Sequence, residues 1–445
     1  MNWSMKRLPS LFAAAGLAVL ASAPASASNL LEVYERAAAE DAELRAAEAE
    51  YRSVLENRPI ARSALLPQIT GEAEAGAFYN DYENRDSMDG QQTRFGVSLL
   101  QSVYDRRNYV ELSQADLDIA RAEAEVQGAR QDLMLRVSEA YFDVLVAQET
   151  LAFAEAELEA IEEQLEQTQR RFDVGLVART DVSEAQAQRD IAVAERINAE
   201  NQLDLAREQL AVITTTYWDE LDMLREDAEL TPPEPADPQA WVDTALENNL
   251  ELTAQRMMTE IAREQIQRQR SEGLPRLNLS ASVTETRYHG IDDTPGTVQM
   301  FNDGTDAQIG LRLEMPFYTG GRVSGLTRQA REDFQAAQEG QTLAERRTTQ
   351  ETRNAYLSVL ANSSRVRALE QALISTQTAF EAAEAGFEVG TRTQVDVLLA
   401  LREVFRAERD YAEARYGFLT NSLRLQRAAG QLSVADLEAI NDLLE

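Results

Sequence analysis

Charged and hydroxyl-bearing side chains gather just past two Val-Gly turns, where they could form hydrogen bonds or an ion pair. These residues are Thr180, Asp181, Arg392 and Asp396. A contact from Arg392 to Thr180 or Asp181 would tie the two turns together. Exposed pairs of this kind are worth about 0–1 kcal/mol each, so a set of them could hold two segments together and still release them easily. The residue types therefore predict a reversible latch rather than bond-making chemistry.

Helix N-capping is the alternative explanation for the same residues. Thr180 or Asp181 could cap the helix that follows the first turn. Thr391 or Thr393 could do the same after the second turn. Capping explains why Thr393 is at its position. It does not explain why the basic Arg392 lies beside a turn whose other charged residues are acidic.

Conventional catalysis has little support in the sequence. The single histidine, His289, lies in a polar strand-loop stretch and is expected to be a surface-loop residue. A hydrolytic triad or a histidine-based metal site needs an oriented constellation of groups, and none is indicated. No Gly-x-x-x-x-Gly-Lys phosphate-binding motif is present either. We therefore predict no enzymatic activity, no cofactor and no metal site, and we expect any energy source to lie in a partner.

The net charge of the chain limits the kinds of molecule that it is expected to bind. The chain has 76 Asp and Glu against 43 Lys and Arg, which gives a formal net charge of −33. Phosphate binding needs clustered cations, so this balance argues against a nucleic-acid partner. Solubility is one explanation for the acidic excess. The other is that a wall lined with acids favours cations inside a conduit.

Two apolar seams lead into the turns and indicate a tandem duplication. Their members step by alternating three and four positions, which is the 3.5-residue repeat of a coiled coil. Every member of the second seam lies 215 positions after its counterpart in the first. The first seam consists of Leu151, Ala154, Leu158, Ile161, Leu165, Thr168 and Phe172, and the second of Val366, Leu369, Leu373, Thr376, Phe380, Ala383 and Phe387. We therefore expect two copies of a long helix, a tight turn and a returning helix.

The duplication sets the predicted domain organisation. The first structural repeat covers residues 28–230 and ends in a helical hairpin at about 109–227. The second covers 239–445, with its hairpin at about 323–430 followed by a C-terminal segment. Between them, the Pro-rich stretch 231–238 predicts a stiff linker.

Each repeat is predicted to open with a helix and then change to a two-residue period. The first of these helices, 29–64, should stop near Pro67 because proline restricts the residue before it. Four strands are predicted, at about 68–80, 92–103, 276–288 and 306–317. One face of each is apolar and the other polar, with Glu and Arg, and the lengths suit tilted outer-membrane strands. A soluble sheet packed on one face is the alternative, but the chain offers no short amphipathic helix to cover that face.

Four strands cannot close a barrel alone, so copies from several protomers would have to complete one. The first 27 residues also point to export, because they have the pattern of a secretory signal peptide. Lys6 and Arg7 form its charged region, residues 8–20 its apolar core, and residues 25–27 an A-x-A cleavage site. The chain has no Cys, so an exported form would use no disulfide. No other apolar run approaches the roughly 20 residues that a membrane helix needs, so a membrane role would require strands or a partner.

The turns and their flanks closely resemble the hairpin tips of the TolC family of outer-membrane channel-tunnels. The segments that carry the resemblance are 172–182 (FDVGLVARTDV) and 389–397 (VGTRTQVDV), supported by 63–68, 274–277 and 316–321. The resemblance covers residues 29–440. It implies a mainly α fold with a membrane β-barrel: a homotrimer in which a twelve-stranded barrel sits in the outer membrane on a twelve-helix tunnel that crosses the periplasm. The coiled coils would close the inner end of that tunnel.

The resemblance also implies roles for individual residues. Thr180, Asp181 and Arg392 match the family's latch between hairpins. Phe387 stands where the family has a latch tyrosine, and it has no hydroxyl to donate. The turns themselves would contact the adaptor, through Val174, Gly175, Leu176, Val177, Val389, Gly390 and Thr391.

Asp396 matches the first of two aspartates that ring the family's entrance. The second falls on Leu399, so that ring would be apolar here. We expect Asp396 alone to supply three carboxylates in a trimer, with Leu399 as a hydrophobic constriction.

The implied function is an exit duct in the outer membrane of a Gram-negative bacterium, conducting drugs or secreted proteins passively and gated at the hairpin tips. Its implied partners are a periplasmic membrane-fusion adaptor, an inner-membrane ABC or proton-driven pump, and outer-membrane lipid. The alternative is a periplasmic coiled-coil adaptor that bridges membranes without a pore. An adaptor would carry one hairpin and a compact β domain, whereas two hairpins and four lipid-type strands are predicted here.

Overall fold

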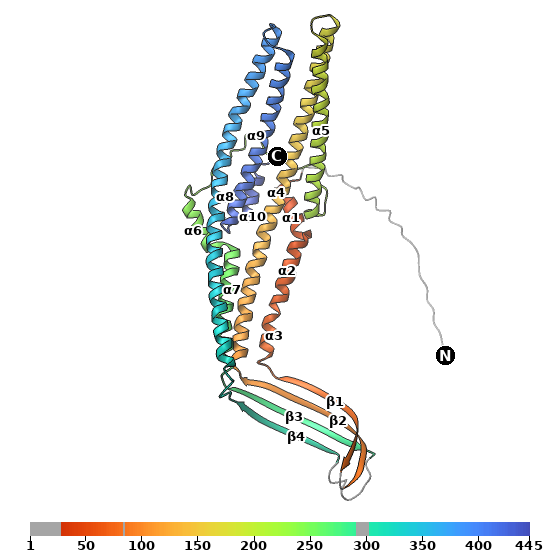
Figure 1. The fold of residues 1–445 in the computed structure, drawn as a ribbon, viewed down its shortest axis with the longest axis vertical. Helices are drawn as coiled ribbons and strands as arrows, with labels where there is room; N and C mark the ends of the chain where they lie inside the picture. The colour runs from red at the N-terminus through yellow and green to blue at the C-terminus, as the bar shows by residue number, and fades with distance from the viewer. Residues whose placement is uncertain (1–27, 83–84, 291–301) are drawn as a thin grey trace, which may run out of the picture.

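An elongated helical body continues at one end into a four-stranded sheet, and two helical hairpins form its other end (Figure 1). The computed structural model describes residues 28–82, 85–290 and 302–445; the predicted signal peptide, 1–27, lies outside the described residues. The predicted combination of long helical hairpins with a small sheet is confirmed.

The same order of elements occurs twice along the chain. The first repeat comprises α1 (Leu30–Glu40), α2 (Ala42–Leu55), α3 (Asn57–Ser63), β1 (Gln68–Tyr82), β2 (Arg85–Tyr104), α4 (Arg106–Asp173) and α5 (Arg179–Thr214). The second comprises α6 (Pro238–Asn248), α7 (Leu250–Ser271), β3 (Arg276–His289), β4 (Gly304–Glu314), α8 (Arg322–Glu388), α9 (Gln394–Ala428) and α10 (Val434–Asn441). Because α4 and α8 each run for almost 70 residues, they carry the chain from the sheet to the hairpin tips (Figure 1).

The opening helix predicted at 29–64 is divided into α1, α2 and α3, so the prediction of one helix was wrong. Asp41 ends α1 in an extended conformation and caps α2, accepting a hydrogen bond from the backbone N–H of Leu44 at 2.7 Å. Asn249 interrupts the second repeat in the same way and accepts from the N–H of Leu252 at 2.9 Å. Helical composition continues across both positions, so only the cap geometry reveals the break.

The sheet is antiparallel, with strand order β1-β2-β3-β4. The polar stretch 80–92 is expected from the sequence to connect two strands, yet β2 already begins at Arg85. Backbone pairing does not require apolar side chains, so the ladder continues past the alternating region. At the other margin, β4 ends at Glu314 rather than at 317, because Pro316 has no N–H to donate.

The pairing register sorts the side chains onto two faces. One row across one face contains Ile69, Leu99, Ala281 and Ile309, and the adjacent row on the opposite face contains Thr70, Ser98, Ser282 and Gln308. Within the described part of the chain, no helix covers either face (Figure 1), and Ile309 is 78% exposed in the single chain. The apolar face ends where Glu285 and Arg287 form an ion pair at 2.7 Å.

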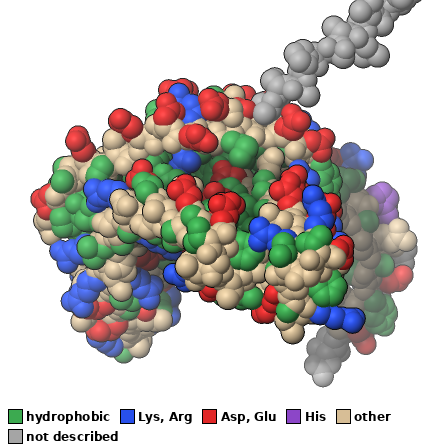
Figure 2. All heavy atoms as spheres, turned by 90° about the horizontal axis from the view of Figure 1, so that it is seen from above, with side chains coloured by type: hydrophobic (Ala, Val, Ile, Leu, Met, Phe, Trp, Pro, Cys, Tyr) green, Lys and Arg blue, Asp and Glu red, His purple; other side chains and the backbone are tan. Residues whose placement is uncertain are grey.

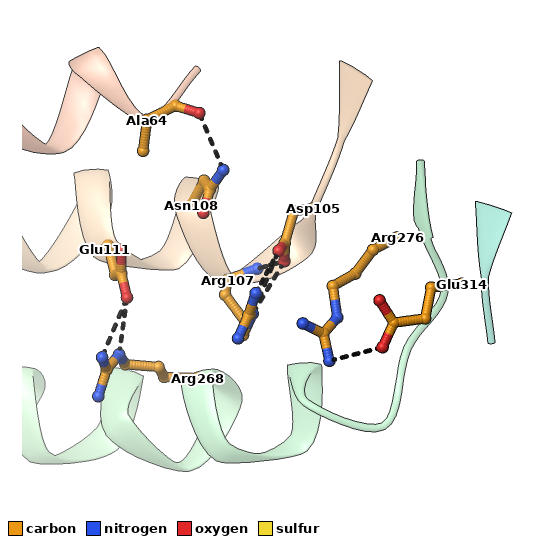
Figure 3. A network of polar contacts seen from close by, with 8 residues as sticks. All are labelled: Ala64, Asp105, Arg107, Asn108, Glu111, Arg268, Arg276 and Glu314. Carbon is orange, nitrogen blue, oxygen red and sulfur yellow. Dashed lines mark hydrogen bonds and ion pairs between the residues drawn. The ribbon is translucent and has the colours of Figure 1, made fainter. Parts of the chain in front are cut away.

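Ion pairs lie where the sheet meets the helices (Figure 3). The buried carboxylate of Asp105 caps α4 and lies 2.6 Å from the guanidinium of Arg107. Arg276, at the start of β3, lies 3.8 Å from Glu314, at the end of β4. The first pair fixes the junction between β2 and α4, and the second joins β3 to β4 at the base of the sheet.

The hydrophobic core lies midway along the body, where α1 and α10 flank α4, α5 and α9 (Figure 1). Its largest buried side chains include Tyr141, Phe142 and Tyr416. The hydroxyl of Tyr141 donates to the carbonyl oxygen of Asp222 at 2.9 Å, which anchors the chain leaving α5. In the part of the chain that the structure describes, no helix is both long and apolar enough to cross a membrane.

Candidate functional site at the hairpin tips

Both hairpin turns are built by the same backbone motif. Gly175 and Gly390 each adopt φ of +77°, which only glycine takes without a steric penalty. Two backbone hydrogen bonds close each turn. In the first turn, the Gly175 N–H donates to Phe172 O at 2.8 Å and the Leu176 N–H donates to Arg171 O at 2.9 Å. In the second turn, the Gly390 N–H donates to Phe387 O at 3.0 Å and the Thr391 N–H donates to Gly386 O at 2.8 Å. This is the Schellman pattern that satisfies the last carbonyls of a helix. The turns are therefore rigid platforms for the side chains around them.

The side chains proposed for adaptor contact lie at the surface of these turns. Val174, Leu176 and Val389 are 71%, 74% and 76% exposed. Gly175, Gly390 and Thr391 are also exposed, and Val177 is half-buried. Figure 2 views the molecule from this end, where apolar side chains lie between scattered acids and a smaller number of bases.

Thr393 caps α9, as the capping alternative predicts, and Asp181 and Asp396 each reach back from the third helical position to the residue that caps their helix. The Asp181 carboxylate accepts from the N–H of Ala178 at 3.1 Å. The Asp396 carboxylate accepts from the N–H of Thr393 at 2.8 Å, and the Thr393 hydroxyl accepts in turn from the N–H of Asp396 at 3.2 Å. Hydrogen bonds from the backbone and hydroxyl of Thr393, with the nearby charge of Arg392, hold the pKa of Asp396 below its ordinary value.

Arg392 lies against its own turn in the single chain. A Cβ at Gly386 would be 2.7 Å from Cγ of Arg392, so the missing side chain of Gly386 makes room for the arginine stem. Within the described residues, neither Thr180 nor Asp181 makes a hydrogen bond or ion pair with Arg392; the hydroxyl of Thr180 points to the Asp181 carboxylate at 3.4 Å. The structure does not bring the predicted latch residues together within one protomer.

A different pair of side chains connects the two tips. The guanidinium carbon of Arg171, in the last turn of α4, lies 4.6 Å from the centroid of the Phe387 ring, in the last turn of α8. A cation within about 6 Å of an aromatic face is attracted by the ring quadrupole, by about 0.5–1 kcal/mol at an exposed site. Phe387 thus makes an inter-hairpin contact that requires no hydroxyl.

Further from the tips, α9 packs into the first hairpin. Leu398 is 2% exposed and forms one cluster with Ile161 of α4 and with Ala185 and Ala192 of α5. Its neighbour Leu399 is 50% exposed and lies outside that cluster. The seam predicted from the 3.5-residue repeat is the face of α4 that receives Leu398.

An arginine one turn beyond Leu398 joins α9 to both helices of the first hairpin. Arg402 donates to the side-chain oxygen of Gln188, on α5, at 3.2 Å and lies 3.6 Å from the Glu157 carboxylate, on α4. Burial raises the pKa of Glu157, and the charges of Arg402 and Arg409 partly oppose that rise.

Sequence reasoning missed Arg171, Leu398 and Arg402 as inter-hairpin residues. One signal was available: Arg171 lies beside the last seam residue, Phe172, and its counterpart 215 positions later is Gly386. A position that is arginine in one copy and glycine in the other marks a place where the copies have diverged. For Leu398 and Arg402, the packing of α9 against α4 was needed.

Comparisons with known proteins identify the family and the fold. The family described as outer membrane efflux protein matches residues 33–216 and 241–431. The chain is 36% identical to outer membrane protein TolC of Escherichia coli (strain K12) over 428 residues, which cover 95% of this chain and 86% of that protein. It is 28% identical over 447 residues to alkaline protease secretion protein AprF of Pseudomonas aeruginosa. The matched region covers 98% of this chain and 91% of AprF. The fold is similar to that of outer membrane protein VceC of Vibrio cholerae, with a TM-score of 0.75 and 20% identity over 90% of this chain and 96% of that one.

Proposed function

This chain belongs to the outer membrane efflux protein family, and on that premise we propose that it is the exit duct of a tripartite efflux or type I secretion system. It is an outer-membrane channel protein that extends into the periplasm. Within that class, the proposed mechanism is passive conduction of drugs or secreted proteins through a lumen that opens and closes at the hairpin tips. The chain has no enzymatic role and uses no cofactor in this proposal.

The open, uncovered sheet is the observation that carries the proposal. Among the described residues, the outer edges of β1 and β4 pair with no other strand, and neither face is covered by a helix. Unpaired edges of this length invite pairing with another copy. Three copies would supply twelve strands and remove every edge, with the apolar face toward lipid and the Glu74–Arg94 ion pair, at 3.2 Å, on the polar face toward the lumen.

Exposed apolar residues on the long helices also support a homotrimer. They lie on α5 (Ile191, Ile197, Leu205 and Val212) and on α8 (Leu343, Leu357, Leu360 and Ile374). On α8 two pairs are 14 positions apart, a multiple of the heptad repeat, so they share a helix face. Packing α8 of one protomer against α5 of its neighbour would bury both sets and close a helical tunnel around an axis.

Two features support the proposed partners: the exposed hairpin turns, and the lack of a nucleotide-binding motif in the chain. The rigid, apolar turns provide a docking surface for a periplasmic membrane-fusion adaptor. An inner-membrane ABC or proton-driven pump would supply the energy, because the chain carries no nucleotide-binding motif. Docking would separate the hairpins outward and open the duct.

Two measurements test the proposal. The protein purified in detergent should insert into planar lipid bilayers and conduct ions, and it should leave the outer-membrane fraction only with detergent. Release from membranes without detergent, with no conductance, would instead fit the periplasmic adaptor alternative. Deleting the gene and profiling both drug sensitivity and the secreted proteome then identifies the cargo class.

A further inference from the structure

We propose that Arg171 is a gate residue, which holds the two hairpin tips of one protomer together through the ring of Phe387. The inference rests on the proposed channel gated at the tips. The contact is within four residues of both turns, at the end of the hairpins that must separate first if they open outward.

Arg171 is held in position by its own backbone and is available for the ring. Its carbonyl oxygen accepts the 2.9 Å hydrogen bond from Leu176 that closes the first turn, which fixes the base of the side chain. In the described residues its guanidinium makes no ion pair within 4.0 Å, and the Phe387 ring lies 4.6 Å away. The preceding residue, Arg170, behaves differently, because it pairs along the helix with Glu166 at 3.1 Å.

Only the first hairpin supplies an arginine for this contact, although the two hairpins are copies of each other. The counterpart of Arg171 in the second hairpin is Gly386, which has no side chain to reach back. The space that a side chain would occupy there is filled by the stem of Arg392. The two tips are therefore complementary: one offers a cation, and the other offers an aromatic face beside a glycine.

The chemistry suits a contact that must both hold and release. A cation over a ring is attracted without directional hydrogen bonds, so it tolerates small shifts of the tips. It also depends on the aromatic face alone, which phenylalanine supplies as well as tyrosine. Below it, Leu398 and Arg402 keep α9 against the first hairpin while the tips move.

A double-mutant cycle in planar bilayers tests the assignment. Arg171→Gln and Phe387→Leu should each raise the ratio of open to closed channel by about two- to five-fold per contact. This range corresponds to the usual strength of an exposed cation–ring pair. The double variant should rise no further than the larger single effect, because each substitution removes the same contact. Phe387→Tyr keeps the aromatic face, so Arg171→Gln should still raise the ratio in that background.

Arg170→Gln is the matched control, because it removes an equal charge one residue away without touching the ring. Trimer size and melting temperature in detergent confirm that each variant is folded. If the unmodified channel conducts and Arg171→Gln does not differ from it, or if the two single effects add, Arg171 is not a gate residue although the channel proposal stands. If the folded, unmodified protein conducts no ions, the channel proposal and this inference fail together.

Discussion

The Asp396 carboxylate and the Thr393 backbone N–H are 2.8 Å apart, and the Thr393 hydroxyl lies at the same distance from that carboxylate. The residue expected to ring the entrance is therefore also part of the cap that begins α9. Capping uses one carboxylate oxygen, Oδ2, and leaves the negative charge in place. The capping role found in the structure and the ring role predicted from the sequence can coexist in one side chain, and variants can separate them.

Replacing Asp396 by Asn should weaken block of the channel by multivalent cations. Each charge pair at contact distance is worth about 1 kcal/mol in water, and three protomers would contribute. The concentration for half-block in bilayer conductance should rise by at least about tenfold. Thr393→Ala is the control, since it removes the capping hydroxyl but keeps every carboxylate, and its block should be retained. Unchanged block in Asp396→Asn would exclude the carboxylate ring.

Cation block should also be insensitive to mild acid. In the single chain the pKa of Asp396 lies below its ordinary value of 3.8, because Thr393 and Arg392 stabilise the ionised form. The stabilisation from the cap is then present above the ordinary pKa and is lost only as pH falls through the lowered one. Block measured at pH 7.5 and pH 5 should agree. A large loss between these values would mean that a group of higher pKa binds the cations.

Gly386→Ala should disturb the second tip. The new Cβ would lie 2.7 Å from Cγ of Arg392, and overpacking of this kind costs about 1–3 kcal/mol, more than the roughly 1 kcal/mol that alanine gains in a helix. We expect a lower melting temperature and altered conductance. Gly417→Ala in α9 provides the comparison, because its Cβ would meet nothing within 4 Å and should raise stability. Equal effects of the two substitutions would show that Arg392 moves aside freely.

Tyr416→Phe should destabilise the middle of the body. The buried hydroxyl donates to the Glu149 carboxylate at 2.6 Å and accepts from the N–H of Leu224 at 3.4 Å. Leaving those groups unpaired costs about 1–3 kcal/mol, which chemical denaturation can measure. Tyr411→Phe is the matched control, because its ring lies 5.7 Å from the Arg415 guanidinium and phenylalanine keeps that contact. A neutral Tyr416→Phe would mean that water replaces the hydroxyl.

Local periodicity accounts for much that was predicted. The 3.5-residue seams and the alternation after Pro67 act between near neighbours in the chain, so they identify long helices and strands without a structure. The recurrence of the same pattern 215 positions later identifies the duplication by comparison of the two halves. Phe172 and Phe387 could be placed at equivalent tips for the same reason. Where one polar side chain redirected the backbone, as Asp41 and Asn249 do, composition gave no warning.

By itself, then, the sequence determined the duplication, the hairpins, the strands and the family resemblance, because each is written as a period or a short motif. Only the tertiary structure decided which side chains meet between hairpins. Arg171 on α4 meets Phe387 on α8, and Leu398 on α9 enters the groove of the first hairpin, because the two hairpins pack against each other. No spacing along one helix encodes its rotation against another. The fold of the second turn places Arg392 on Gly386, where the sequence favoured a latch to Thr180 or Asp181.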